Sequence, residues 1–235
     1  APGDVVLAPN PSYPIHTFGF IIAGATIRSV PTTPDERYWE SLERAMRFTV
    51  PRPSILIVNY PSNPTAETVD LAFYERLVAW AKENKVWILS DLAYSELYYD
   101  GNPTRSILEV PGAKDVAVEF TSMSKTFSMA GWRVGFAVGN QRLIAALKRV
   151  KSYLVYGAFT QIQAAACAAL NGPQDIVEAN RQLYHKRRDV LVESFGKQDS
   201  SMMRIFSQSD CLIIRPPNAP AVEAGDTVPV LLLRP

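Results

Sequence analysis

The chain has 235 residues, of which 47% are hydrophobic and 20% are charged, and its formal net charge is +1. This composition is that of an ordinary globular protein, long enough for one large domain or two small ones. The sequence has no block of like charges and no apolar run long enough to span a bilayer, so we expect neither a nucleic-acid partner nor a membrane partner.

The cysteines and histidines point to no special chemistry. Cys167 and Cys211 have no CxxC motif and no histidine near them, which argues against a disulfide framework or a zinc site. This usage fits a reducing compartment, so we expect a cytoplasmic protein without a metal. His16 and His185 stand far apart in the sequence, and we expect ordinary structural or surface roles for both.

The first part of the chain alternates between two kinds of pattern. Short runs of apolar and β-branched residues predict strands, and apolar residues at a spacing of about 3.6 predict helices. The helix expected at 15–24 is apolar enough to be buried, and Gly24 suits its C-terminal end. Strands are expected at 5–8, 25–30, 54–58 and 86–89, and helices at 15–24, 36–48 and 67–84.

The same alternation continues in the second part. Two strands are predicted at 116–120 and 132–138, and a long helix at 173–195. Basic and Ala-rich helices are expected between them, at 140–151 and 159–170. Short strands could follow at 204–207 and 211–214, and no helix is expected at 216–235. Strands that alternate with helices predict an α/β fold with a mainly parallel sheet covered by helices.

Polar residues follow three of the predicted strands. Asn63 comes after the strand at 54–58, Asp91 after the next strand, and Lys125 after the strand at 116–120. Ligands of open α/β sheets bind beyond the carboxyl ends of the strands, so these side chains should converge on one crevice. A lysine in this place suits covalent chemistry, because its amine can form a Schiff base with a carbonyl. By itself, S-x-S-K would equally fit a surface lysine.

Several neighbours of Lys125 could hold a phosphate. The hydroxyls of Ser122 and Ser124 flank the lysine closely, and Arg133 follows eight residues after it; guanidinium and hydroxyl groups are good phosphate ligands. Each residue also has an ordinary interpretation. Arg133 could form a simple ion pair, and Asp91 could cap a helix or a turn.

Tyrosines and an asparagine complete the set of candidates. Tyr94 lies three residues after Asp91, although a tyrosine alone would more often be a core or rim aromatic. Asn63 alone would fit a turn before proline. Tyr13 could stack on a flat ligand or simply pack on Pro14.

These motifs together resemble a known family. N-P-S-Y at 10–13, N-P-T at 63–65, D-x-x-Y at 91–94 and S-x-S-K at 122–125, with Arg133 behind them, are similar to the class I/II, fold-type I aminotransferases that use pyridoxal phosphate. The resemblance covers residues 1 to about 195. In its detailed residues, the sequence is most similar to bacterial alanine (glutamate–pyruvate) and diaminopimelate-type aminotransferases.

The resemblance implies a role for each candidate. Lys125 would hold the cofactor as a Schiff base and then move the proton during transamination. Asp91 would pair with the pyridine nitrogen, and Asn63 and Tyr94 would hydrogen-bond the phenolic oxygen. Tyr13 would stack on the ring. The phosphate would be bound by Ser122, Ser124 and Arg133.

The resemblance also implies parts that this sequence does not match. The glycine-containing phosphate loop of the family should precede Ala1, and the tail after Gly196 does not resemble the family's small domain. Arg204, Arg215 and Arg234 lie in that tail, and none has the context of the arginine that grips the substrate carboxylate. We therefore expect an internal fragment with an altered or truncated tail, as a reading-frame change would produce. The expected parts are a cofactor-binding domain at 1–172, an inter-domain helix at 173–195 and a divergent segment at 196–235.

The predicted function is transfer of an amino group between an amino acid and a 2-oxo acid, in a homodimer by resemblance. A lyase or decarboxylase on the same fold is one rival, since the cofactor serves several reactions. The other rival is a catalytically impaired fragment or a non-catalytic module that only binds pyridoxal phosphate.

Overall fold

The chain forms two compact units, Ala1–Arg181 and Gln182–Pro235. The three-part division expected from the sequence stays a prediction. Among the described residues, no helix is both long enough and apolar enough to cross a membrane. The computed structural model describes residues 2–155, 157–195, 211–213 and 230–232.

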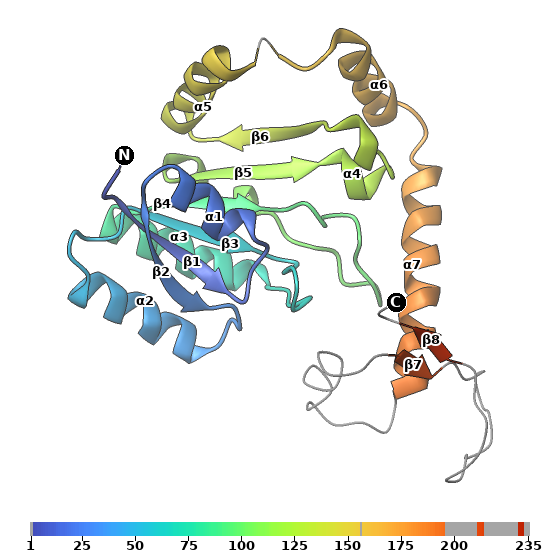
Figure 1. Ribbon diagram of the computed structural model, residues 1–235, viewed down its shortest axis with the longest axis horizontal. Helices are drawn as coiled ribbons and strands as arrows, with labels where there is room; N and C mark the ends of the chain where they lie inside the picture. The colour runs from blue at the N-terminus through green and yellow to red at the C-terminus, as the bar shows by residue number, and fades with distance from the viewer. Residues whose placement is uncertain (1, 156, 196–210, 214–229, 233–235) are drawn as a thin grey trace. The chain divides into compact units, whose positions relative to one another are not determined.

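The first unit is built on a six-stranded sheet in the order β2-β1-β3-β4-β5-β6 (Figure 1). Strands β1 to β5 pair in parallel, and β6 is antiparallel to β5. The α/β class with a mainly parallel sheet is therefore confirmed, and the carboxyl ends of five strands lie along one edge. The strands are Val5–Asn10 (β1), Thr26–Pro31 (β2), Ile55–Asn59 (β3), Trp87–Asp91 (β4), Ala117–Ser122 (β5) and Gly135–Gly139 (β6).

Helices connect the strands and lie near the predicted ranges. The helices of the first unit and the long helix that leaves it are Ile15–Ile22 (α1), Glu36–Phe48 (α2), Leu71–Asn84 (α3), Met123–Thr126 (α4), Gln141–Leu154 (α5), Thr160–Asn171 (α6) and Asp175–Phe195 (α7). Different helices cover the two faces of the sheet, α2 and α3 on one face and α1 on the other. Short 3-10 turns are Ile107–Glu109 (η1), Ala113–Asp115 (η2) and Ala130–Trp132 (η3).

The main core lies between the sheet and helices α2 and α3. Leu56 and Ile88 of the sheet are fully buried there against Leu42 of α2 and Leu77 of α3. A smaller cluster on the opposite face joins Val6, Ala8 and Ile57 to Phe20 of α1. Burial on both faces explains why the strands are continuous apolar runs.

Two helices differ from their predicted form. Helix α3 begins at Leu71 and not at 67, because the side chain of Asp70 accepts the Phe73 N–H and caps the helix there. Helix α1 is not buried as expected: His16 is its one buried residue. Gly24, with φ of +83°, lies just beyond the end of α1, as glycine usually does.

Strand β6 begins at Gly135, later than the predicted start at 132. The preceding residues form the turn η3, and Arg133 has a left-handed backbone with φ of 53°. A Cβ on Gly135 would lie 2.6 Å from the Thr121 carbonyl oxygen. Glycine at this position therefore allows β6 to approach the end of β5 closely.

The second unit contains two short antiparallel strands, Cys211–Ile213 (β7) and Val230–Leu232 (β8). The strand predicted at 211–214 is thus present at 211–213. The strand predicted at 204–207 lies outside the described residues, as does most of the tail for which no helix was expected.

Candidate functional site

One cavity of about 560 Å³ lies at the carboxyl edge of the sheet, and every site residue predicted from the sequence lines it. The ends of β4 and β5 supply Asp91 and Ser122, and helix α4 supplies Lys125. The parallel strands explain this convergence, because their carboxyl ends share an edge. The predicted residues in the cavity wall are Tyr13, Asn63, Asp91, Tyr94, Ser122, Ser124, Lys125 and Arg133.

The Asp91 carboxylate is held by two contacts. Its Oδ1 accepts the Ala93 N–H at 3.1 Å, and its Oδ2 lies 2.8 Å from His16 Nε2. The Asp91 side chain is 26% exposed and that of His16 is 6% exposed. The carboxylate therefore lines the cavity, and its contact with the buried histidine fixes its orientation.

His16 is a cavity residue that the sequence patterns did not identify. It contacts Asp91 directly and lines the cavity, whereas an ordinary structural or surface role was expected. Its ring also packs edge-on against Tyr13, with 5.9 Å between centroids. Among the described residues its Nδ1 has no hydrogen-bond partner. No local signal marked it, because His16 lies in the first turn of α1 and its partner Asp91 is 75 residues away in the sequence.

Tyr94 lies between Asn63 and Lys125. Its hydroxyl is 3.5 Å from Asn63 Nδ2, a long hydrogen bond. The Lys125 Nζ lies 5.7 Å from the centroid of the Tyr94 ring, within the range of a cation–π contact. An amide donor, a phenol and an amine thus lie next to one another.

Hydroxyl and guanidinium groups also line the cavity. Ser122 caps helix α4, since its Oγ accepts the Ser124 N–H at 3.1 Å. The guanidinium of Arg133 donates to the Ala130 carbonyl at 3.2 Å, which leaves most of its N–H groups for other acceptors. The arrangement offers a cation and two hydroxyls to an anionic group.

The sequence matches a family of known proteins over most of its length. A family model described as aminotransferase class I and II matches residues 1–213. The chain belongs to this family. The resemblance carried by the four motifs is confirmed.

Individual aminotransferases are similar over most of the chain. AatC of Rhizobium meliloti (strain 1021), provisionally described as an aminotransferase, is 64% identical over 197 residues, which are 84% of this chain and 49% of AatC. The glutamate-pyruvate aminotransferase AlaC of Escherichia coli (strain K12) is 53% identical over 191 residues, 81% of this chain and 46% of AlaC. A solved aminotransferase from Staphylococcus aureus is 32% identical with a TM-score of 0.75, over 83% of this chain and 52% of that one. The chain spans about half the length of the curated relatives it matches.

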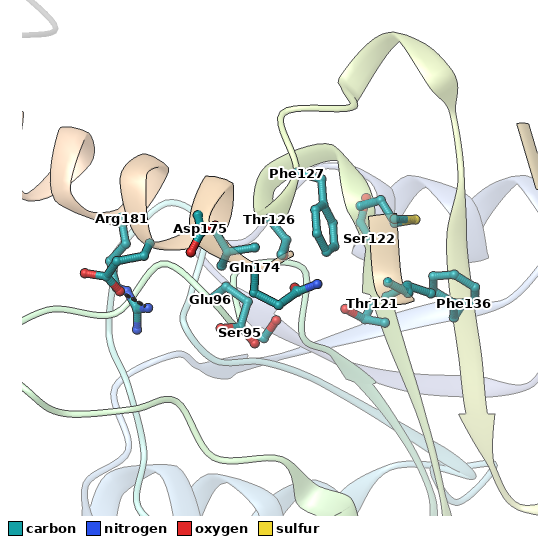
Figure 2. A pocket seen from close by; sticks show the side chains of 14 residues that line it. Ser95, Glu96, Thr121, Ser122, Thr126, Phe127, Phe136, Gln174, Asp175 and Arg181 are labelled. Carbon is teal, nitrogen blue, oxygen red and sulfur yellow. Dashed lines mark hydrogen bonds and ion pairs between the residues drawn. The ribbon is translucent and has the colours of Figure 1, made fainter. Parts of the chain in front are cut away.

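A second cavity of about 640 Å³ lies beside the first and shares Thr121 and Ser122 with it (Figure 2). It is lined by Thr126 of α4 and by the first turns of α7. The Asn180 side chain of α7 donates to the Thr126 carbonyl at 3.2 Å. Helix α4, which carries Lys125, is thus held by β5 at one end and by α7 at the other.

Helix α7 also contacts the segment that carries Tyr94. The Arg181 guanidinium lies 4.1 Å from the centroid of the Tyr98 ring and forms an ion pair with Glu178. Figure 2 shows Arg181 at one end of this second cavity, which Asp175 and Glu96 also line. The start of α7 therefore contacts both α4, which carries Lys125, and the segment after β4, which carries Tyr94.

Proposed function

We propose that the whole protein is an aminotransferase that uses pyridoxal phosphate to move an amino group between an amino acid and a 2-oxo acid. The observation that carries the proposal is the shared cavity of Lys125, Asp91 and Arg133 in a chain of this family. An amine, a carboxylate and an arginine with hydroxyls match the aldehyde, the ring nitrogen and the phosphate of that cofactor.

Lys125 and Asp91 would act on the reacting atoms. The Lys125 Nζ would hold the cofactor covalently, and once released it would take a proton from the substrate Cα and return it. Asp91 would keep a proton on the ring nitrogen, and the contact of its Oδ2 with His16 supports that orientation. When bound, the cofactor supplies an electron sink for bond breaking at Cα.

The other residues would bind and orient. Asn63 and Tyr94 would donate hydrogen bonds to the phenolic oxygen, and their 3.5 Å contact supports a shared acceptor. Tyr13, braced by the His16 ring, would stack on the ring of the cofactor. The phosphate would lie against Ser122, Ser124 and Arg133, which line the cavity together.

Alanine, glutamate and their 2-oxo acids are the proposed substrates. Similarity to the glutamate-pyruvate aminotransferase AlaC supports this choice. A homodimer in the cytoplasm is proposed by resemblance to the family, and the cysteine usage of the chain agrees with a reducing compartment.

A spectroscopic half-reaction tests the proposal. The full chain is loaded with pyridoxal phosphate and mixed with L-alanine, and both the visible absorption band and the pyruvate formed are followed. We expect the band to shift while pyruvate appears in an amount equal to the loaded cofactor. A band that amino acids leave unchanged would favour the non-catalytic binding module, and release of carbon dioxide would favour a decarboxylase.

A further inference from the structure

Asn59, the last residue of β3, forms an unusual set of hydrogen bonds. Its Nδ2 donates to the Asp91 carbonyl at 2.9 Å and to the Pro61 carbonyl at 3.2 Å. Its Oδ1 accepts the Asn63 N–H at 2.9 Å. Asn59 is 4% exposed, so a single buried side chain connects the main chains of Asn63 and Asp91.

Only an amide can form this set. Both N–H donors of Asn59 face carbonyl oxygens, and its oxygen faces an N–H donor. An aspartate would lose both donors, and an aliphatic side chain would lose all three bonds. Rotation of the amide by 180° would place its N–H donors against the Asn63 N–H and its oxygen against two carbonyl oxygens. The contacts therefore also fix the orientation of the amide.

The two connected segments carry groups that are proposed to bind different atoms of the cofactor ring, the phenolic oxygen and the ring nitrogen. Asp91 lies at the end of β4, directly beside Asn59 in the parallel register. Asn63 lies in the loop that follows β3, where the Asn59 Oδ1 receives its main-chain N–H. The position of Asn63 relative to Asp91 therefore depends on Asn59 more directly than on the β3–β4 ladder alone.

We infer that Asn59 is a positioning residue, which sets the separation between the Asn63 amide and the Asp91 carboxylate. This inference rests on the proposed function for its consequence in cofactor binding. Asn59 also lines the cavity, but its polar atoms are occupied by main-chain partners. It acts through Asn63 and Asp91 and not as a ligand of the cofactor.

The test compares Asn59→Leu and Asn59→Asp with Ser90→Ala in the full chain. Ser90 precedes Asp91, is buried, and donates its hydroxyl to Glu119, away from the cavity. Ser90→Ala thus removes a buried hydrogen bond beside Asp91 without touching the connection to Asn63. It is the matched control for a purely structural loss.

Two readouts are taken. Hydrogen exchange of the Asn63 N–H, measured without cofactor, should be at least tenfold faster in Asn59→Leu and unchanged in Ser90→Ala. Asn59→Asp keeps the acceptor and should retain most of this protection. Titration with pyridoxal phosphate should give at least tenfold weaker binding and a shifted pH midpoint of the visible band in both Asn59 variants.

The outcomes separate the inference from the proposed function. Unchanged exchange at Asn63 in Asn59→Leu, or equal losses of cofactor affinity in Asn59→Leu and Ser90→Ala, would overturn the inference. If Asn59→Leu does not fold, the pH midpoint in Asn59→Asp decides, and a midpoint equal to that of the unchanged chain overturns it. A parent chain that forms no visible band contradicts the proposed function, whereas the exchange measurement still decides whether Asn59 connects Asn63 to Asp91.

Discussion

Two regions of the first unit are packed in contrasting ways. The region from β2 to β5 buries large side chains such as Tyr38, Tyr74 and Leu77. The region that forms β6, α5 and α6 buries only Ala166 among its described residues. Apolar residues of α5 such as Leu154 are exposed, although the basic helix expected at 140–151 is present at Gln141–Leu154. A sequence pattern therefore identifies a helix, but not whether the same chain covers its apolar residues. Lys125 lies between these regions.

The largest expected effect is in the closely packed region. Leu77→Ala, at a residue with 0% exposure, should lower the free energy of unfolding by about 3 kcal/mol, because it leaves a cavity in the core. Leu154→Ala, at a residue that is 74% exposed, should lower it by less than about 0.5 kcal/mol. Urea unfolding of both variants measures the contrast. Equal losses would show that α5 is covered in solution and would contradict the difference in packing between the two regions.

Gly135→Ala probes the junction between the two regions. The new Cβ would meet the Thr121 carbonyl at 2.6 Å, and since that oxygen is main chain, relief requires β5 and β6 to separate. We expect a loss of about 1–3 kcal/mol in urea unfolding and weaker cofactor binding, because Ser122 follows Thr121. Gly131→Ala, where a Cβ meets nothing within 4 Å, is the control and should change neither.

His16→Phe tests the contact between helix α1 and the candidate site. The variant keeps an aromatic ring but loses the contact with Asp91. A hydrogen bond to a charged group contributes about 1.5–3 kcal/mol, so the Kd for pyridoxal phosphate should rise about tenfold or more. Thr17→Val, one residue along α1 and outside both cavities, serves as control. An unchanged Kd in His16→Phe would remove His16 from the site.

The smallest expected effect is a pH dependence in the packed region. Glu119 is buried and accepts hydrogen bonds from Ser90, Ser106 and Ile107. Burial is the largest influence and raises the pKa of its carboxyl above the ordinary value of 4.5. The native state thus keeps the proton to higher pH than the unfolded chain. Its contribution to stability is fully present below pH 4.5 and is lost as the pH rises through the folded-state pKa.

Glu119→Gln makes this effect measurable. The variant cannot ionise, so the free energy of unfolding of the parent chain should fall relative to it as the pH rises above 4.5. Urea unfolding of both proteins between pH 4 and pH 7 gives the difference between their free energies of unfolding. The pH dependence that comes from the other carboxylates cancels in this difference. A difference that does not vary with pH, or that varies in the opposite direction, contradicts the assignment.

Sequence patterns predicted the strands and the candidate site for a common physical reason. Buried parallel strands are apolar throughout, and the polar residues that follow them, such as Asp91 and Lys125, must meet at the carboxyl edge. His16 and Asn59 were missed because their roles depend on Asp91, which is 75 and 32 residues away in sequence. No local pattern records such contacts. The apolar spacing placed the start of α3 too early, because spacing alone does not show that the Asp70 side chain caps the helix.

The central claim is that Lys125 lies in an assembled cofactor site, and borohydride trapping tests it most directly. The full chain is incubated with pyridoxal phosphate, reduced and mapped by peptide mass analysis, with Lys125→Ala as control. The account predicts one modified peptide, which contains Lys125, and no modification in the control. Modification spread over exposed lysines such as Lys85 and Lys114, equal in both proteins, would contradict it.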